Sequence, residues 1–198
     1  MMKFRSALLA GCLAASTSLG LSACSSLPDE VDRAQIDAGS RAALNKLVSE
    51  NAAARAINSQ SRAVLVFPSM VKAGLGVGGA YGEGELIRGG STVDYYSSFT
   101  GSWGLQAGAQ SYGYAVFLMN DDAVDYLKKS EGWEIGVGPT VVLVNAGVAE
   151  NLSTSTLKED AYAFVFDQKG LMAGISIEGT KITKLQKTVF GSGEPGRR

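Results

Sequence analysis

Residues 74–84 read GLGVGGAYGEG, and the meaning of this stretch decides the fold. It contains Gly74-x-Gly76-x-x-Gly79, the spacing of a dinucleotide-binding loop, which follows a strand and opens a helix. The alternation argues against such a loop. Every even position from 74 to 84 is glycine or alanine, a period of two that is typical of a strand. No amphipathic helix pattern follows, so the sequence predicts a strand with one nearly bare face.

A bare strand face needs a physical reason, because a glycine costs roughly 0.5–1 kcal/mol relative to alanine in a regular element. One explanation is close packing, in which a helix or the rings of Tyr95 and Trp103 press against the backbone. The other is a groove in which an acyl chain or another ligand lies against the sheet. Close packing is the preferred interpretation.

The segments on both sides of this stretch also have strand character. Residues 63–67, AVLVF, predict a buried strand that Pro68 ends. A turn at 88–91 leads into residues 91–106, which alternate as a long half-buried strand. Its more apolar face carries Val93, Tyr95, Phe99, Trp103 and Leu105.

Helical spacing predicts helices over residues 30–58, with a break at 49–51, and one helix after Asn120. Further strands are expected at 112–119 and 135–144, and as a hairpin of 162–166 with 171–177. The predicted fold class is α+β. It consists of a curved, antiparallel, glycine-rich sheet or small barrel, N-terminal helices, and one further helix after Asn120.

The N-terminus is typical of a secretory signal peptide, residues 1–23. Lys3 and Arg5 precede an apolar run, and Leu-Ser-Ala-Cys ends it at Cys24. This ending resembles a bacterial lipobox, in which the cysteine is acylated with chains such as palmitate and becomes the new N-terminus. We therefore expect a lipidated tether over 24–29. Ser25, in place of an aspartate, favours anchoring in the outer membrane, facing the periplasm.

Composition limits the function. The chain has 18 basic and 19 acidic residues and no histidine. Without Lys3 and Arg5 the mature charge is −3, which argues against nucleic-acid binding. Triads and zinc sites that need histidine are excluded. The two cysteines are Cys12 and Cys24, so the mature domain is held by its core without a disulfide.

Candidate catalytic groups are few. Glu83 and Glu85 share one strand face and could act as paired carboxylates, but such a pair is more often a solvated strand end. Asp121, Asp122 and Asp125 lack the spacing of a calcium loop. The sequence predicts no enzyme, no metal site and no cofactor.

Candidate lipid-headgroup residues lie in the N-terminal helices: Arg41, Lys46 and Arg55. On a membrane surface these side chains would face anionic headgroups. The alternative, a helix packed on a sheet, is preferred because acidic residues are interspersed among the bases.

Several motifs, in order, resemble the SYLF domain. They are AVLVFP at 63–68, VKAG at 71–74, YGEG at 81–84, VFLMN at 116–120, WEIG at 133–136 and KGLMAGISIEG at 169–179. The resemblance covers residues 34–185, so we expect a SYLF-like domain over 30–190 and a disordered tail over 191–198.

The resemblance implies a lipid-binding domain, since eukaryotic members bind phosphoinositides and some bind actin. We therefore expect a non-enzymatic, lipid-anchored envelope protein. Its domain would bind anionic phospholipid or phosphoinositide-like headgroups, and actin-type binding follows from family resemblance alone. The alternative is a structural or stress-related envelope protein that binds another protein and has no lipid specificity beyond its anchor.

Overall fold

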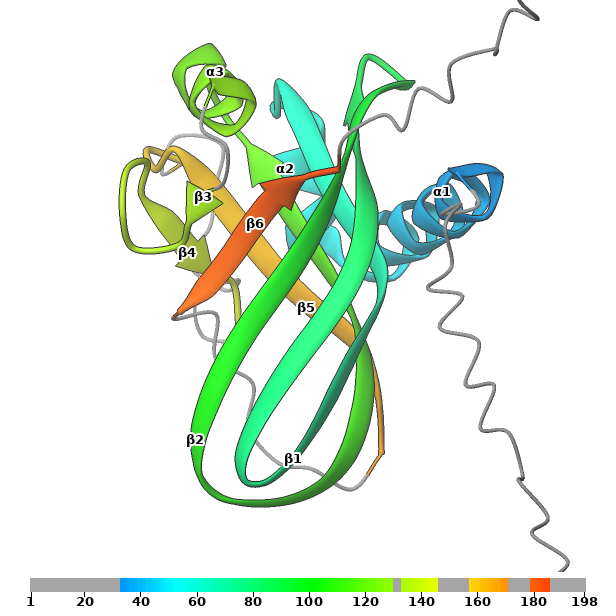
Figure 1. Ribbon diagram of the computed structural model, residues 1–198. Helices are drawn as coiled ribbons and strands as arrows, with labels where there is room; N and C mark the ends of the chain where they lie inside the picture. Colours follow the sequence, from blue (N-terminus) through cyan, green and yellow to red (C-terminus); the bar gives the residue numbers. More distant parts are fainter. Residues whose placement is uncertain (1–32, 130–132, 146–156, 171–178, 186–198) are drawn as a thin grey trace, which may run out of the picture. The chain divides into compact units, whose positions relative to one another are not determined.

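The computed structural model describes residues 33–129, 133–145, 157–170 and 179–185. They belong to one compact unit, Asp32–Arg198, in which helices and a largely antiparallel sheet confirm the α+β class (Figure 1). The predicted signal peptide, the tether, Cys24 and the 191–198 tail lie outside the described residues.

A very long hairpin dominates the sheet. Strands β1, Ala63–Arg88, and β2, Ser91–Leu118, pair antiparallel from Ala63↔Leu118 to Arg88↔Ser91. The predicted turn is confirmed, with positive φ at Gly89 (58°) and Gly90 (79°), a backbone conformation that glycine adopts at little cost.

The expected strand end at Pro68 is wrong, because β1 continues to Arg88. Pro68 lies within a register shift between Phe67 and Met70, where a missing N–H is tolerated. The expected strands 91–106 and 112–119 are likewise one strand, β2.

The hairpin bends back on itself, and both strands turn together at the end far from α3 (Figure 1). A Cβ on Gly82 would lie 2.6 Å from Met70 Sδ, and one on Gly84 would collide with the carbonyl of Val66. The bare face of the second half of β1 therefore lies against the first half. Close packing is confirmed for these glycines, but the partner is the same strand, where we expected a helix or the rings of Tyr95 and Trp103.

Four short strands complete the sheet: β3, Trp133–Glu134; β4, Val141–Leu143; β5, Ala161–Gly170; and β6, Thr180–Lys184. The order is β3-β6-β2-β5-β4, with β1 on β2, and β4 pairs parallel to β5. The expected strand 135–144 is thus reduced to β4. The expected turn after Phe166 is also wrong, because β5 runs on to Gly170; its expected partner, 171–177, lies outside the described residues.

The helices begin and end close to their predicted positions: α1, Arg33–Glu50; α2, Ala52–Asn58; and α3, Asp121–Lys129. Asn51 Oδ1 accepts a bond from Ala54 N at 2.9 Å, and Asn120 Oδ1 accepts one from Ala123 N at 2.8 Å. Both asparagines are N-caps, which satisfy amides that the helix leaves unpaired. No helix in the described ranges has the length and apolarity needed to cross a membrane.

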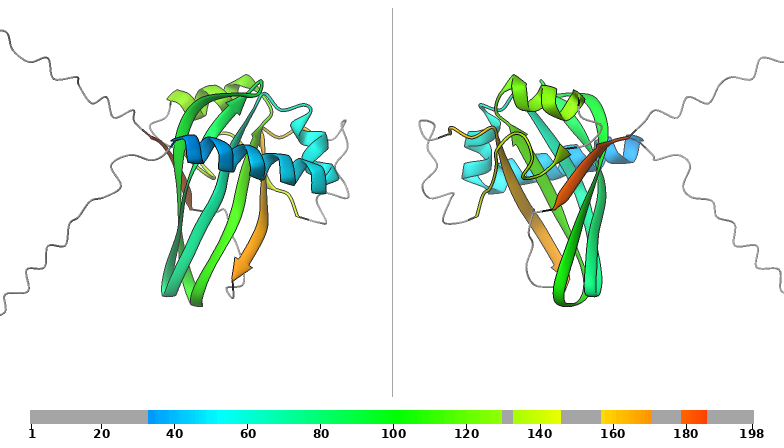
Figure 2. Two further views of the ribbon diagram at one scale, coloured as in Figure 1. Left: turned by 90° about the vertical axis from the view of Figure 1, so that its right-hand side faces the viewer. Right: turned by 60° about the vertical axis from the view of Figure 1, so that its left-hand side comes forward.

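Two hydrophobic clusters lie on opposite faces of the hairpin. On the inner face, where the halves of the hairpin meet, Phe67, Met70 and Leu86 pack with α3 and Trp133. On the outer face, Val64, Val66 and Ile87 pack with α1 and α2, and Figure 2 shows α1 crossing the strands. The N-terminal helices therefore pack on a sheet, as preferred from the sequence.

The burial of residues 91–100 is the reverse of what alternation suggested. Phe99 is 55% exposed and Val93 37%, although both lie on the face expected to be buried. Tyr96, Ser98 and Thr100, on the other face, are buried. The reason lies in the tertiary structure. The folded-back hairpin covers the inner face of β2, whereas α1 covers only part of its outer face.

Candidate functional site

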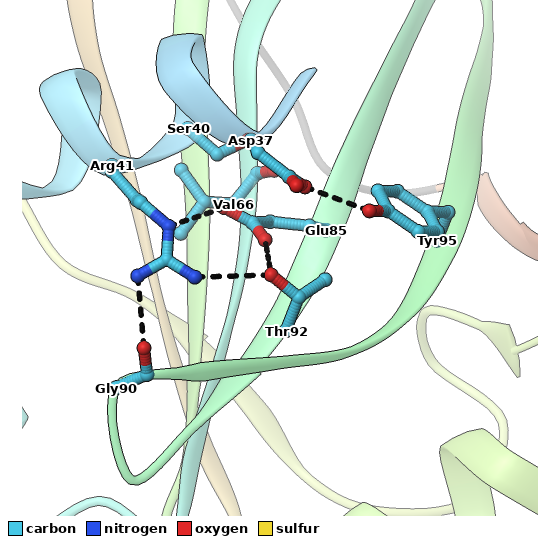
Figure 3. Close-up of polar contacts among 8 residues, drawn as sticks. All are labelled: Asp37, Ser40, Arg41, Val66, Glu85, Gly90, Thr92 and Tyr95. Carbon is cyan, nitrogen blue, oxygen red and sulfur yellow. Dashed lines mark hydrogen bonds and ion pairs between the residues drawn. The ribbon is translucent and has the colours of Figure 1, made fainter. Parts of the chain in front are cut away.

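The densest group of polar contacts lies where α1 meets the turn of the hairpin (Figure 3). Helix α1 contributes Asp37 and Arg41, β1 contributes Glu85, and β2 contributes Thr92 and Tyr95. We call these five residues the Glu85 cluster. Asp37 and Arg41 are four residues apart, so they share one face of α1.

Glu85 is fully buried, with 0% of its side chain exposed. Its Oε2 accepts a hydrogen bond from Thr92 Oγ1 at 2.6 Å, while Oε1 has no hydrogen-bond partner and lies 4.0 Å from Arg41 Nε. Burial raises the pKa of this carboxyl, and nearby Asp37 adds to the rise. The Thr92 bond and the Arg41 charge act in the opposite direction.

Arg41 connects α1 to the hairpin turn. Its guanidinium donates to Gly90 O at 2.8 Å and to Thr92 Oγ1 at 3.0 Å. The side chain remains 44% exposed. It therefore reaches over the edge of the cluster and fixes the turn while its charge faces the Glu85 carboxyl.

Tyr95 completes the cluster. Its hydroxyl donates to Asp37 Oδ1 at 2.9 Å, and the Arg33 guanidinium lies 5.0 Å from its ring centroid. Burial, together with the bond to Asp37, raises the pKa of the Tyr95 hydroxyl. The first two turns of α1 are thus fastened to β2 by a carboxylate–phenol bond and a cation–π contact.

The paired-carboxylate hypothesis finds no shared site. Glu83 Oε1 accepts a bond from Tyr81 Oη at 2.7 Å, whereas Glu85 lies beneath α1 with different partners. A carboxyl with no exposed surface does not meet a substrate directly. The cluster therefore links α1 to the hairpin, and its buried Glu85 carboxyl holds a proton more readily than an exposed one.

The headgroup candidates do not form one patch of free cations. Lys46 Nζ donates to Asp167 Oδ1 at 2.5 Å, and this bond raises the pKa of Lys46. Arg55 donates to Val48 O and Ser49 O, at the end of α1. All three candidates therefore have intramolecular partners. Arg41 and Arg55 donate to backbone carbonyls, whereas the partner of Lys46 is the partly exposed side chain of Asp167.

A comparison with protein families matches part of this chain. Residues 99–188 match the Ysc84 family model, described as Las17-binding protein actin regulator. Residues 99–188 therefore match the SYLF family. No curated protein matches the chain. The family match begins within β2 and takes in α3 and β3 to β6.

The aspartates near α3 of the SYLF domain have structural partners. Asp121 accepts a bond from Arg88 at 2.7 Å, and Asp125 from Lys129 at 3.3 Å. Nowhere in the described part of the domain do three or more acidic or cysteine side chains gather in a way that could hold a metal ion.

The long hairpin also exposes large apolar side chains that sequence reasoning missed. We call Val71, Leu75, Val77, Tyr81 and Phe99 the outer apolar stripe; they are 49–83% exposed. The signal was present in the sequence, because residues 73–82 contain no charged side chain. It was overlooked because alternation alone does not say which face of a strand is covered.

Proposed function

We propose that the chain is a non-enzymatic, lipid-anchored envelope protein whose SYLF domain binds lipid. The observation that carries the proposal is the match of residues 99–188 to the SYLF family. By resemblance, that family implies binding of anionic phospholipid or phosphoinositide-like headgroups. The Glu85 cluster supports a non-catalytic role, because its buried carboxyl is occupied by contacts between α1 and the hairpin.

The anchor is part of the proposal. Acylation of Cys24 would hold the domain at the outer membrane, on the periplasmic face, since two or more acyl chains give stable attachment. Cys24→Ser should abolish incorporation of labelled palmitate and move the full chain out of the membrane fraction. Retention of label in that variant would contradict the lipobox assignment.

Lipid binding by the domain is tested by co-sedimentation of residues 25–198 with vesicles. Removing the anchor is justified because Asp32–Arg198 forms one compact unit with its own hydrophobic clusters. We expect binding to anionic vesicles that exceeds binding to neutral ones and weakens as salt screens the headgroups. Equal recovery in the supernatant with and without vesicles would refute lipid binding.

The contribution of the basic residues is tested best at Lys46, whose contacts are exposed. Lys46→Gln should reduce binding to anionic vesicles. Lys129→Gln is a matched control, because Lys129 is also an exposed lysine paired with an aspartate. Equal effects of the two substitutions would show that only net charge matters and would remove α1 from the headgroup site.

A protein ligand is the second candidate. The family description names Las17 binding and actin regulation, and for this chain actin-type binding rests on that family resemblance alone. A stoichiometric protein partner recovered with the wild-type domain, together with no vesicle binding, would favour a structural or stress-related envelope protein.

A further inference from the structure

The outer apolar stripe occupies one face of β1 through the bend. Odd positions from 71 to 81 read Val, Ala, Leu, Val, Gly, Tyr, and the register shift between Leu75 and Val77 adds its extra residues to β2, so the alternation of β1 is kept. Leu75 is 83% exposed and Val77 62%. Phe99, the ladder partner of Tyr81, extends the stripe over Gly79, where a Cβ would lie 3.3 Å from its ring.

The inner face of the same part of the hairpin buries several polar side chains. Lys72 and Gln110 are ladder partners and are 7% and 5% exposed. Ser98 is 0% exposed and Thr100 7%. Among the described side chains that flank the bend, these four polar ones are thus buried while the apolar ones of the stripe are exposed, the reverse of the usual arrangement in water.

Charge is also missing from the bend. Residues 73–82 and 95–120 contain no Asp, Glu, Lys or Arg, although solvent-exposed strands usually carry charges that oppose aggregation. The first charged residue beyond the stripe is Glu83, bonded to the Tyr81 hydroxyl. The apolar surface is thus bounded by an aromatic residue with a polar tip, a residue type that favours membrane–water interfaces.

We propose that the outer apolar stripe inserts into the acyl region of a phospholipid bilayer. Leu75 and Val77 enter first, and the rings of Tyr81 and Phe99 lie closer to the headgroups. The inference rests on the proposed lipid-binding function and names the surface that performs it.

The shape of the bend favours a bilayer over a protein groove. Because the inner faces of the hairpin meet, the outer face at the bend is convex (Figures 1 and 2). A convex apolar surface enters a deformable lipid layer, whereas it offers no groove to an apolar peptide. If Cys24 is acylated, residues 24–32 can span at most about 30 Å when fully extended. The start of α1 would then stay within that distance of the bilayer.

Insertion is tested with a fluorescent probe, because residues 25–198 contain no cysteine. Leu75→Cys carrying an environment-sensitive dye should shift to the blue and brighten when phospholipid vesicles are added. The same dye at Lys129→Cys, on a side chain 79% exposed on α3, should not shift.

The outcomes separate the two claims. If the domain co-sediments with vesicles but the Leu75 probe does not shift, the stripe is wrong and lipid binding stands. If the domain does not co-sediment, both are wrong. A shift without vesicles that grows with protein concentration would show that a second copy covers the stripe and would also overturn the proposal.

A second variant measures the contribution to affinity. Leu75→Ser with Val77→Ser should lower the vesicle partition coefficient about tenfold or more, in neutral and anionic vesicles and at high salt alike. Val137→Ser is the control, since Val137 is 57% exposed away from the stripe. An equal loss in the control, or none in the double variant, would refute insertion.

Discussion

Single residues fix how closely the two halves of the hairpin approach. Gly84 leaves no room for a Cβ beside the Val66 carbonyl, so Gly84→Ala should reduce the free energy of unfolding by about 1–3 kcal/mol. Gly101→Ala, where a Cβ meets nothing within 4 Å, should have much less effect. Urea denaturation of both variants checks this, and similar stabilities would contradict the fold-back.

Glu85 gives the domain a pH dependence of known sign. Burial raises its pKa from 4.5, so the folded state holds the proton more tightly than the unfolded chain. Its contribution to stability is complete below pH 4.5 and is lost as pH rises through the folded pKa. Glu85→Gln keeps the neutral form, so its stability should gain on that of the wild type between pH 4 and neutral.

The pKa of Asp160 is shifted in the opposite direction, so Asp160 affects stability in a different pH range. Bonds from Thr140 N and from Asn120 lower its pKa from 3.8, so its contribution to stability is present above pH 3.8 and is lost on acidification below it.

Thermal denaturation of wild type and Glu85→Gln across pH 3–8 isolates the effect of Glu85, because Asp160 is present in both proteins. A difference between the two proteins that does not change with pH would contradict the buried carboxyl.

At the scale of elements, α1 is held on the hairpin by Arg41. Arg41→Gln removes the bonds to Gly90 and Thr92 and should cost about 1 kcal/mol of unfolding free energy. Lys46→Gln should cost less, because its ion pair with Asp167 is exposed on both sides. Hydrogen exchange should show the Arg41 effect at the 88–92 turn, and an effect spread evenly over the sheet would contradict the clamp.

Elements with strong local signals were predictable from the sequence. The caps at Asn51 and Asn120 and the glycine turn at 89–90 act over three or four residues. The continuation of β1 past Pro68 was not predictable, because the register shift that accommodates proline depends on pairing with β2. The burial of Glu85 beneath α1 depends in the same way on contacts between residues 37–41 and 85–95.

At the scale of the whole molecule, the period of β2 was predictable but the direction of its faces was not. Alternation correctly predicted that Phe99 and Ser98 lie on opposite faces of β2. The fold-back then buried Ser98 and exposed Phe99. Polarity in the sequence predicts which strand face is buried only if apolar side chains always face the core. The outer apolar stripe departs from this rule, because its apolar side chains are exposed.

Membrane binding by the domain is tested most directly by co-sedimentation of residues 25–198, which lack Cys24, over a range of phospholipid concentrations. The domain should move into the vesicle pellet in proportion to the available lipid, and a fraction of this binding should survive high salt. A domain that stays in the supernatant at every lipid concentration would contradict lipid binding, because the domain would then make no membrane contact of its own.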